Sequence, residues 1–290
     1  MIVDFRVRPP YKSFLTCHIF RPRPPIADPV KVPGLAIGRP PMPSFELRSW
    51  EVFLREVDDA RIDHAVVMGR QSAGDFGWVS NDDVAEIVRG YAGRFIGFAG
   101  IDPSKPADAV REVKRAITEL GFRGVSMEPG WCTPPLYPDD PLIDPVYEVC
   151  QQLGAICAIT ASIFVGPDLS YSDPIHIQRV ALRYPNLRIA VSHACWPHVP
   201  TMLGVAMQCL NVYLVPDFYG YIPNMPMALE YARAANYYLG HRMLYASSYP
   251  VRPLGQSIDE FRRLPLEPDV MRRCLADNAV PLLGLKTAAV

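Results

Sequence analysis

Residues 187–208, LRIAVSHACWPHVPTMLGVAMQ, contain the unit that decides the fold: a short apolar run, a polar turn and a stretch of helical length. The same alternation recurs along the whole chain, and strands that alternate with helices predict a parallel sheet. We expect strands near residues 2–7, 64–69, 95–101, 123–128, 155–160, 187–192, 212–216 and 243–247. We expect helices near residues 45–60, 81–91, 106–120, 144–153, 174–183, 197–208 and 225–239, with a C-terminal helical region over 257–285.

Eight such units in 290 residues predict one α/β domain over residues 1–290, a single (β/α)8 TIM barrel with C-terminal helices. An open, doubly wound sheet would be expected to have a glycine-rich phosphate turn after an early strand. The sequence has no such turn, so we favour the closed barrel.

A proline-rich insertion follows the first expected strand. Residues 9–44 contain ten prolines, and proline fixes φ and removes a backbone donor. The segment therefore cannot form a regular helix or a central strand. In a barrel it would lie over the face that carries the active site, where it would act as a lid or as an arm between subunits of a homodimer.

The overall composition excludes several classes of protein. Hydrophobic residues make up 49% of the chain and charged residues 20%, with a net charge of −1. There is no basic tract for nucleic acid and no apolar run long enough to span a membrane. The seven cysteines lack CxxC spacing, which argues against a zinc ribbon or a disulfide framework. We expect a cytoplasmic protein.

The first expected strand carries three charged residues at alternate positions. Asp4, Arg6 and Arg8 are predicted to share one face, with Phe5 and Val7 on the other. Buried charges are unfavourable unless they are paired. The guanidinium groups of Arg6 and Arg8 suit a carboxylate ligand at the carboxyl end of the strand, where barrels place their sites. The alternative is a structural Asp–Arg network.

Polar residues also follow other expected strands. Glu128 would act as a general base or as a counter-ion for the arginines, and the sequence leaves both roles open. His193 ends the sixth strand and could transfer a proton near neutral pH. A further catalytic candidate is Asp217, after the seventh strand. The remaining substrate-binding candidates are Arg70, Ser248, Tyr249 and Arg252.

Five segments in order resemble the amidohydrolase-related family, which includes aminocarboxymuconate-semialdehyde decarboxylase-like enzymes. That family opens with a hydrophobic pair and then Asp-x-His-x-His. The matching segments are 2–10 (IVDFRVRPP), 122–129 (FRGVSMEP), 184–193 (YPNLRIAVSH), 242–250 (RMLYASSYP) and 274–279 (CLADNA). The resemblance extends over nearly the whole chain and implies a TIM barrel that acts on small carboxylates.

The departures from this family pattern concern its metal ligands. Arg6 and Arg8 stand where the family has two metal-binding histidines, Thr160 where it has a histidine, and Ser248 where it has an aspartate. Arginine offers no lone pair to a metal ion, and a catalytic zinc site needs about three protein ligands. We therefore expect no metal at the usual place and no other cofactor.

The resemblance supports three hypotheses of function. The first is a metal-independent, lactonase-like hydrolase acting on a small carboxylated substrate, with His193, Asp217 or Glu128 activating water. The second is a decarboxylase or another lyase on the same scaffold. The third is a non-catalytic barrel that binds a ligand. Release of carbon dioxide without incorporation of water would distinguish the second from the first.

Overall fold

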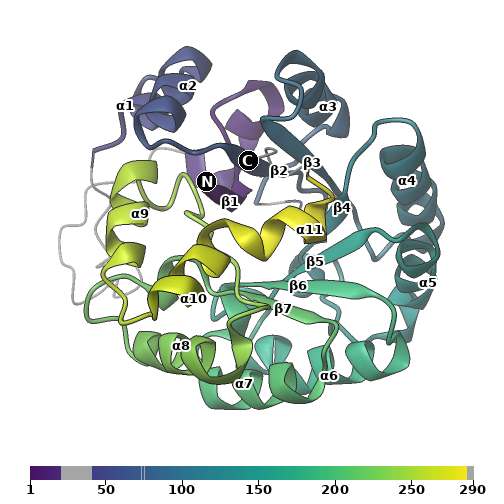
Figure 1. Ribbon diagram of the computed structural model, residues 1–290. Coiled ribbons are helices and arrows are strands. Elements are labelled where there is room, and N and C mark those ends of the chain that lie inside the picture. Colours follow the sequence, from purple (N-terminus) through teal and green to yellow (C-terminus); the bar gives the residue numbers. More distant parts are fainter. Residues whose placement is uncertain (21–40, 73, 75, 286–290) are drawn as a thin grey trace, which may run out of the picture.

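Seven parallel strands form a curved sheet in the order β1-β2-β3-β4-β5-β6-β7. This computed structural model describes residues 1–20, 41–72, 74 and 76–285. The strands are β1 (Val3–Val7), β2 (His64–Met68), β3 (Phe95–Gly100), β4 (Gly124–Met127), β5 (Ile156–Thr160), β6 (Arg188–Ser192) and β7 (Val212–Val215). They lie inside a ring of helices (Figure 1). The predicted α/β class and parallel sheet are confirmed.

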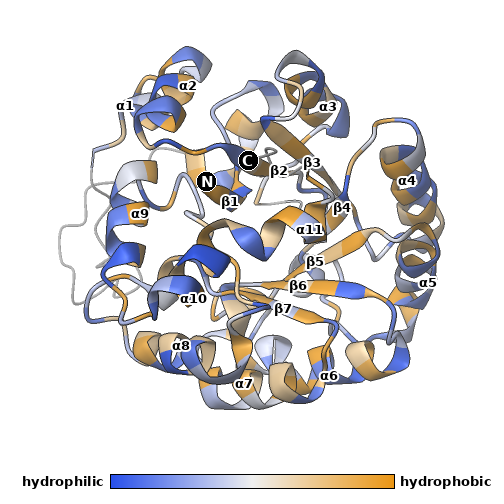
Figure 2. Ribbon diagram, viewed as in Figure 1, coloured by the Kyte–Doolittle hydropathy of each residue, from blue (hydrophilic) through white to orange (hydrophobic). Residues whose placement is uncertain are grey.

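The helices follow the strands in the expected alternation. Strand residues are mainly apolar, whereas most helices mix apolar and polar residues (Figure 2). The helices are α1 (Pro43–Glu46), α2 (Trp50–Asp59), α3 (Asn81–Gly90), α4 (Pro106–Thr118), α5 (Asp144–Leu153), α6 (Pro174–Arg183), α7 (Val199–Gln208), α8 (Ala228–Ala234), α9 (Leu254–Arg262), α10 (Pro268–Arg272) and α11 (Ala279–Leu283).

Two of the expected helices are interrupted. The predicted helix over 45–60 is divided into α1 and α2, because Arg48 adopts a left-handed conformation (φ 49°) and the hydroxyl of Ser49 then caps α2 by accepting from the amide of Val52. The C-terminal region is divided between α9 and α10, where Pro265 and Pro268 cannot continue a helix.

The expected eighth strand, 243–247, does not form as a regular strand. The segment from Met243 to Tyr249 still lies between β7 and β1: Met243 bridges to Leu214, and Tyr249 bridges to Val7. Its ladder is interrupted because the amide of Tyr245 bonds the carbonyl of Cys274, and the amide of Ser247 bonds the carboxylate of Asp4. An irregular segment thus takes the place of the eighth strand.

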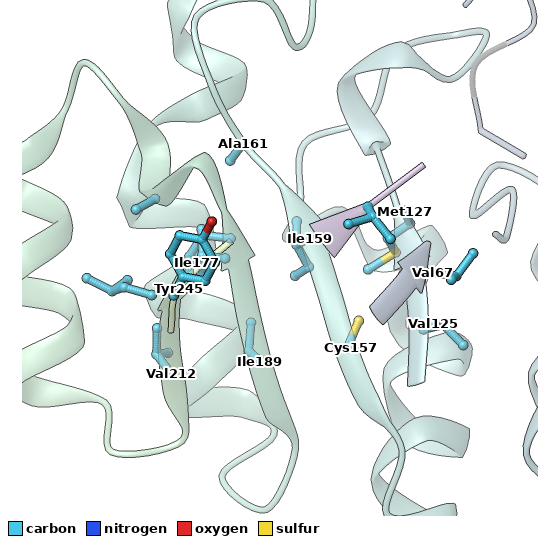
Figure 3. Packing of buried hydrophobic residues seen from close by; sticks show 14 of the residues in the cluster. Val67, Val125, Met127, Cys157, Ile159, Ala161, Ile177, Ile189, Val212 and Tyr245 are labelled. Atoms are coloured by element: carbon cyan, nitrogen blue, oxygen red, sulfur yellow. The ribbon is translucent and has the colours of Figure 1, made fainter. Parts of the chain in front are cut away.

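Two apolar clusters lie on the two faces of the sheet. The outer cluster packs the strands against the helices and includes Met127 and Ile159 (Figure 3). The inner cluster joins Phe5 and Ala158 to residues of α11, among them Leu283. Helix α11 crosses the middle of the ring (Figure 1), so it closes one end of the barrel interior.

Strand β1 departs from the predicted alternation. Val3 and Phe5 belong to the inner cluster but Val7 belongs to the outer one, and the pairing of β1 with β2 shifts register between Asp4 and Val7. The prediction that Asp4, Arg6 and Arg8 share one face is therefore wrong. Asp4 lies between two inner residues and therefore faces the other side of the sheet. The register shift, equivalent to a β-bulge, follows Asp4 and interrupts the alternation after it.

The proline-rich segment falls partly outside the described residues. Its first part forms two short 3₁₀ helices, η1 (Lys12–Thr16) and η2 (His18–Phe20), which pack against the segment after β2. The amide of His18 bonds the carbonyl of Phe76 at 3.0 Å. The roles expected of the segment as a lid or a subunit arm remain predictions.

Candidate active site

Two clusters of ionised side chains lie at the carboxyl ends of the strands. One joins Arg6 to residues that follow β6 and β7, and the other joins Arg8 to residues that follow β2 and β4. The three arginines are between 4% and 6% exposed. The structure therefore brings together seven of the nine predicted site residues: Arg6, Arg8, Arg70, Glu128, His193, Asp217 and Ser248.

One nitrogen of Arg6 is the centre of the first cluster. Nη1 lies 3.0 Å from Nε2 of His193, 3.0 Å from Oδ2 of Asp217 and 2.6 Å from Oγ of Ser248. Asp217 is fully shielded from solvent at its side chain. The guanidinium thus holds a buried carboxylate, an imidazole and a hydroxyl around one terminal nitrogen.

The contact with Arg6 fixes the protonation of His193. Arginine is only a donor, so Nε2 of His193 accepts and the proton of the neutral ring resides on Nδ1. Nδ1 lies 2.9 Å from Oδ2 of Asp217, in an orientation that does not make a hydrogen bond. Burial and then the charge of Arg6 lower the pKa of His193 to about 4. The imidazole is therefore neutral near pH 7.

The three residues around Arg6 share an unusual backbone conformation. His193, Asp217 and Ser248 have φ angles of 66°, 56° and 58°, in the left-handed region that disfavours residues with a side chain. His193 begins the short helix η7 (His193–Cys195), and Asp217 begins η8 (Asp217–Gly220). Such strain concentrates at functional sites, where the surrounding fold holds it in place.

The second cluster is built on one carboxylate. Oε1 of Glu128 accepts from Nη2 of Arg8 at 2.9 Å and from Nε of Arg70 at 3.2 Å. Oε2 accepts from the hydroxyl of Ser72 at 2.8 Å. Burial favours the neutral acid, but Arg70 and Arg8 hold the pKa of Glu128 below 4.5. Of the two roles left open for Glu128, the structure shows the contacts of a counter-ion.

The described part of the site has more positive than negative charge. Three guanidinium groups face two carboxylates, those of Asp217 and Glu128. Burial, followed by repulsion from Arg70 and Arg6, lowers the pKa of Arg8 to about 9. Nε of Arg6 and Nε of Arg8 are buried without a hydrogen-bond partner among the described residues. An anion would relieve this imbalance.

Asp4 does not compensate the arginines directly. Its Oδ1 accepts from the amides of Arg6 and Ser247, at 3.1 Å and 2.9 Å. Burial raises the pKa of Asp4 to about 7, so near neutral pH a substantial fraction of this carboxyl is protonated. Its role is to tie β1 to the irregular segment that follows α8.

Two predicted substrate-binding residues do not join the clusters. The hydroxyl of Tyr249 lies 2.6 Å from Oγ of Ser44, and its ring packs 4.9 Å from that of Phe53 on α2. Arg252 pairs with Glu260 on α9. In these contacts both side chains face the helices. Their expected role in substrate binding stays a prediction.

Aromatic side chains that the sequence analysis missed border both clusters. Trp131, at the end of η4 (Pro129–Trp131), stacks on Phe76 at 4.4 Å, and the guanidinium of Arg70 lies 4.9 Å from the Trp131 ring. Tyr219 stacks on Trp196 at 4.9 Å and meets the His193 ring edge-on at 5.3 Å. All four lie in segments that follow strand ends, and this position in the sequence could have identified them as candidate site residues.

The residues around Arg6 do not fit a divalent metal ion. No group of three or more His, Cys, Asp or Glu side chains within the described ranges could hold one. Arg6 places a guanidinium between His193 and Asp217, the two side chains there with lone pairs to offer. A metal ion would have to displace a fixed positive charge.

Comparison with known proteins defines the family. The family model described as Amidohydrolase matches residues 44–285. The chain belongs to this amidohydrolase family. A solved TIM-barrel protein of Bordetella bronchiseptica is 34% identical, with 98% of each chain covered and a TM-score of 0.86. These findings confirm the resemblance expected from the five sequence segments.

Two of the named proteins that this chain resembles are decarboxylases. A 2-amino-3-carboxymuconate-6-semialdehyde decarboxylase of Dictyostelium discoideum is 33% identical over 98 residues, 34% of this chain and 27% of the relative. The match thus spans about a quarter of that protein. A dihydroxybenzoic acid decarboxylase of Polaromonas, solved with bound manganese and 2-nitroresorcinol, is 19% identical over 86% of this chain and 92% of its own, with a TM-score of 0.66. At 19% identity, this similarity shows a shared fold and nothing further.

The family model places the chain in an enzyme family. The named proteins that it resembles are decarboxylases, the class of enzyme in the second hypothesis, and none of those reported is a lactonase. None of the helices in the described residues combines the length and apolar character that a membrane crossing needs.

Proposed function

We propose that this amidohydrolase-family protein decarboxylates a small carboxylic acid without a divalent metal ion. The observation that carries the proposal is the excess of buried guanidinium groups over carboxylates at the strand ends. A substrate carboxylate would supply the missing negative charge. Arginine suits this role because its planar fork matches a carboxylate.

Arg8 and Arg70 are the proposed carboxylate-binding pair. Both already point at one oxygen of Glu128, and Nε of Arg8 has no partner among the described residues. Glu128 would hold the two guanidinium groups in place and would not itself take part in proton transfer. Its lowered pKa keeps it ionised for this purpose.

The aromatic rings at the border favour a flat substrate. Trp131 and Phe76 form one stacked pair, and Trp196 and Tyr219 form another, so a planar acid would find ring faces and edges next to both clusters. Phe76 is 36% exposed, which leaves it accessible to a ligand. We therefore propose an aromatic or conjugated acid.

His193 is the proposed proton donor. In the absence of substrate, burial and Arg6 keep its pKa at about 4. A bound carboxylate would offset the positive charges of Arg6 and Arg8, raise that pKa and allow the ring to take a proton. The proton would then move to the carbon that bears the carboxylate, the C–C bond would break, and its electron pair would stay with that carbon. Carbon dioxide and a neutral imidazole remain.

Arg6 would replace the metal ion of metal-dependent enzymes by providing a fixed positive charge beside the reacting group. Its Nη1 contacts Nε2 of His193, so this contact would have to open before the ring takes up the proton that it delivers. Electrostatic stabilisation by one well-placed donor is worth about 3 kcal/mol.

The test uses benzoate and the three monohydroxybenzoates, each labelled with ¹³C in the carboxyl group. Membrane-inlet mass spectrometry would follow labelled carbon dioxide, with and without EDTA. We expect release from at least one acid, unchanged by EDTA. Arg8→Gln should lower kcat/KM by about a hundredfold or more, whereas Arg89→Gln, on the exposed face of α3, should leave it unchanged.

Three outcomes would overturn the proposal. Loss of activity in EDTA that returns with manganese would exclude a metal-independent reaction. Absence of labelled carbon dioxide from all four acids, or incorporation of ¹⁸O from labelled water into a ring-opened product of a lactone, would exclude decarboxylation of this substrate class.

A further inference from the structure

We infer that the hydroxyls of Ser126, Thr160 and Ser192 form a subsite for an uncharged oxygen of the substrate. This inference deepens the proposed function and rests on it. The three residues come from β4, β5 and β6, which are neighbours in the sheet. Within that order Thr160 is paired directly with Ser192 across β5 and β6.

The three side chains project into the barrel interior. Their strand neighbours Met127, Ile159 and Val191 belong to the outer cluster, so alternation places the hydroxyls on the inner face. Ala158 and Ala190, the preceding inner residues on β5 and β6, belong to the inner cluster. Because alanine side chains are short, the wall below the hydroxyls has little bulk.

Each hydroxyl is buried and lacks a hydrogen-bond partner within the described residues. The exposed fractions are 0% for Ser126, 2% for Thr160 and 0% for Ser192. Buried polar groups are nearly always hydrogen-bonded, so three unsatisfied hydroxyls on adjacent strands require an explanation. A ligand hydroxyl can accept from two of them and donate to the third, and a ligand carbonyl oxygen can accept from two.

The position of the hydroxyls connects them to the proposed carboxylate site. Ser126 lies two residues before Glu128, and Ser192 immediately precedes His193. The subsite therefore lies between the Arg8 cluster and the Arg6 cluster. The nearby guanidinium groups disfavour a cationic substituent, so the geometry points to a hydroxyl or carbonyl oxygen on a substrate whose carboxylate reaches Arg8 and Arg70.

The experiment compares benzoate with its three monohydroxy isomers by isothermal titration calorimetry. For the wild type we expect one isomer to bind about tenfold more tightly than benzoate. Thr160→Val, Ser192→Ala and Ser126→Ala should bring this preference below twofold in at least one variant and leave benzoate affinity unchanged. Thr118→Val, on the exposed end of α4, is the matched control and should retain the preference.

Thermal melting supplies a second readout that does not depend on activity. If the hydroxyls serve a ligand, Thr160→Val removes an unsatisfied buried group and should leave Tm unchanged or raise it. A lowered Tm in all three variants would show a structural role and overturn the inference. An unchanged preference in all three variants, with benzoate binding still lost in Arg8→Gln, would overturn the subsite and leave the proposed function standing. If the wild type bound none of the four acids, the proposed function itself would fail.

Discussion

Burial acts in opposite directions on two titratable side chains next to Arg6. It raises the pKa of Asp4 to about 7 and lowers the pKa of His193 to about 4. Both groups are thereby uncharged over part of the acidic range: the carboxyl group of Asp4 is protonated there, and the imidazole of His193 is deprotonated. Their effects on the free energy of unfolding consequently have opposite signs.

The pH dependence of stability tests this pair. The unfolded chain has pKa values of about 3.9 for Asp and 6.5 for His. Between about pH 4 and 7, native Asp4 binds more protons than the unfolded state, so its contribution falls as pH rises. Native His193 binds fewer, so its contribution is present above pH 6.5 and falls as pH drops toward 4. The change amounts to about 4 kcal/mol for Asp4 and about 3 kcal/mol for His193, and in the wild type the two largely offset.

Single variants should separate the two contributions. In Asp4→Asn, urea unfolding should show stability falling, relative to wild type, as pH is lowered from 6.5 to 4. In His193→Asn it should fall, relative to wild type, as pH is raised from 4 to 7. Difference curves that stay flat in both variants would contradict the assigned pKa directions.

At the scale of elements, the end of helix α2 has a residue with a side chain where helices usually have glycine. Helix α2 is followed by Arg61, which has a left-handed φ of 54°. The amide of Arg61 bonds the carbonyl of Asp58, and the amide of Ile62 bonds the carbonyl of Val57. This closing turn is most often made by glycine, which has no Cβ to crowd the backbone.

Replacing that residue should stabilise the protein. We expect Arg61→Gly to raise the free energy of unfolding by about 1 kcal/mol, because it relieves left-handed strain at an exposed position. Arg55→Gly, the same change on the exposed face of the interior of α2, should lower it by about 1 kcal/mol. Chemical denaturation of both variants checks the pair. Equal effects would show that the turn carries no strain.

Helix-end signals and strand alternation explain what the sequence could and could not predict. β2 to β7 and most helices were predictable because apolar periodicity dominates them. The irregular 243–249 segment was not predictable, because two of its amides donate hydrogen bonds to Asp4 and Cys274, which are distant in sequence. In the site, Arg6, Arg8 and Glu128 were predicted by their positions at strand ends, whereas the contacts of Tyr249 with Ser44 and Phe53 depend on tertiary packing that the sequence pattern does not show.

At the scale of the whole molecule, the C-terminal helix belongs to the barrel core. Leu283 on α11 is 1% exposed and lies in the same inner cluster as Phe5 of β1. The last part of the described chain thus packs against the first strand. A cavity made there would weaken the strand that carries Arg6 and Arg8.

A large-to-small substitution tests this coupling. Leu283→Ala should lower the free energy of unfolding by about 3 kcal/mol, since a buried leucine is replaced by a cavity. Leu210→Ala, at a position that is 74% exposed, should change it by less than about 0.5 kcal/mol. Global unfolding followed by circular dichroism distinguishes the two. A small effect at Leu283 would show that α11 is only loosely attached.

The closed end of the barrel also has a consequence for turnover. With α11 across one end of the interior, the described residues leave the opposite end for a molecule that reaches the arginines. In the proposed decarboxylation, the product would then leave by the same end at which fresh substrate enters. The product should therefore inhibit by competing with fresh substrate.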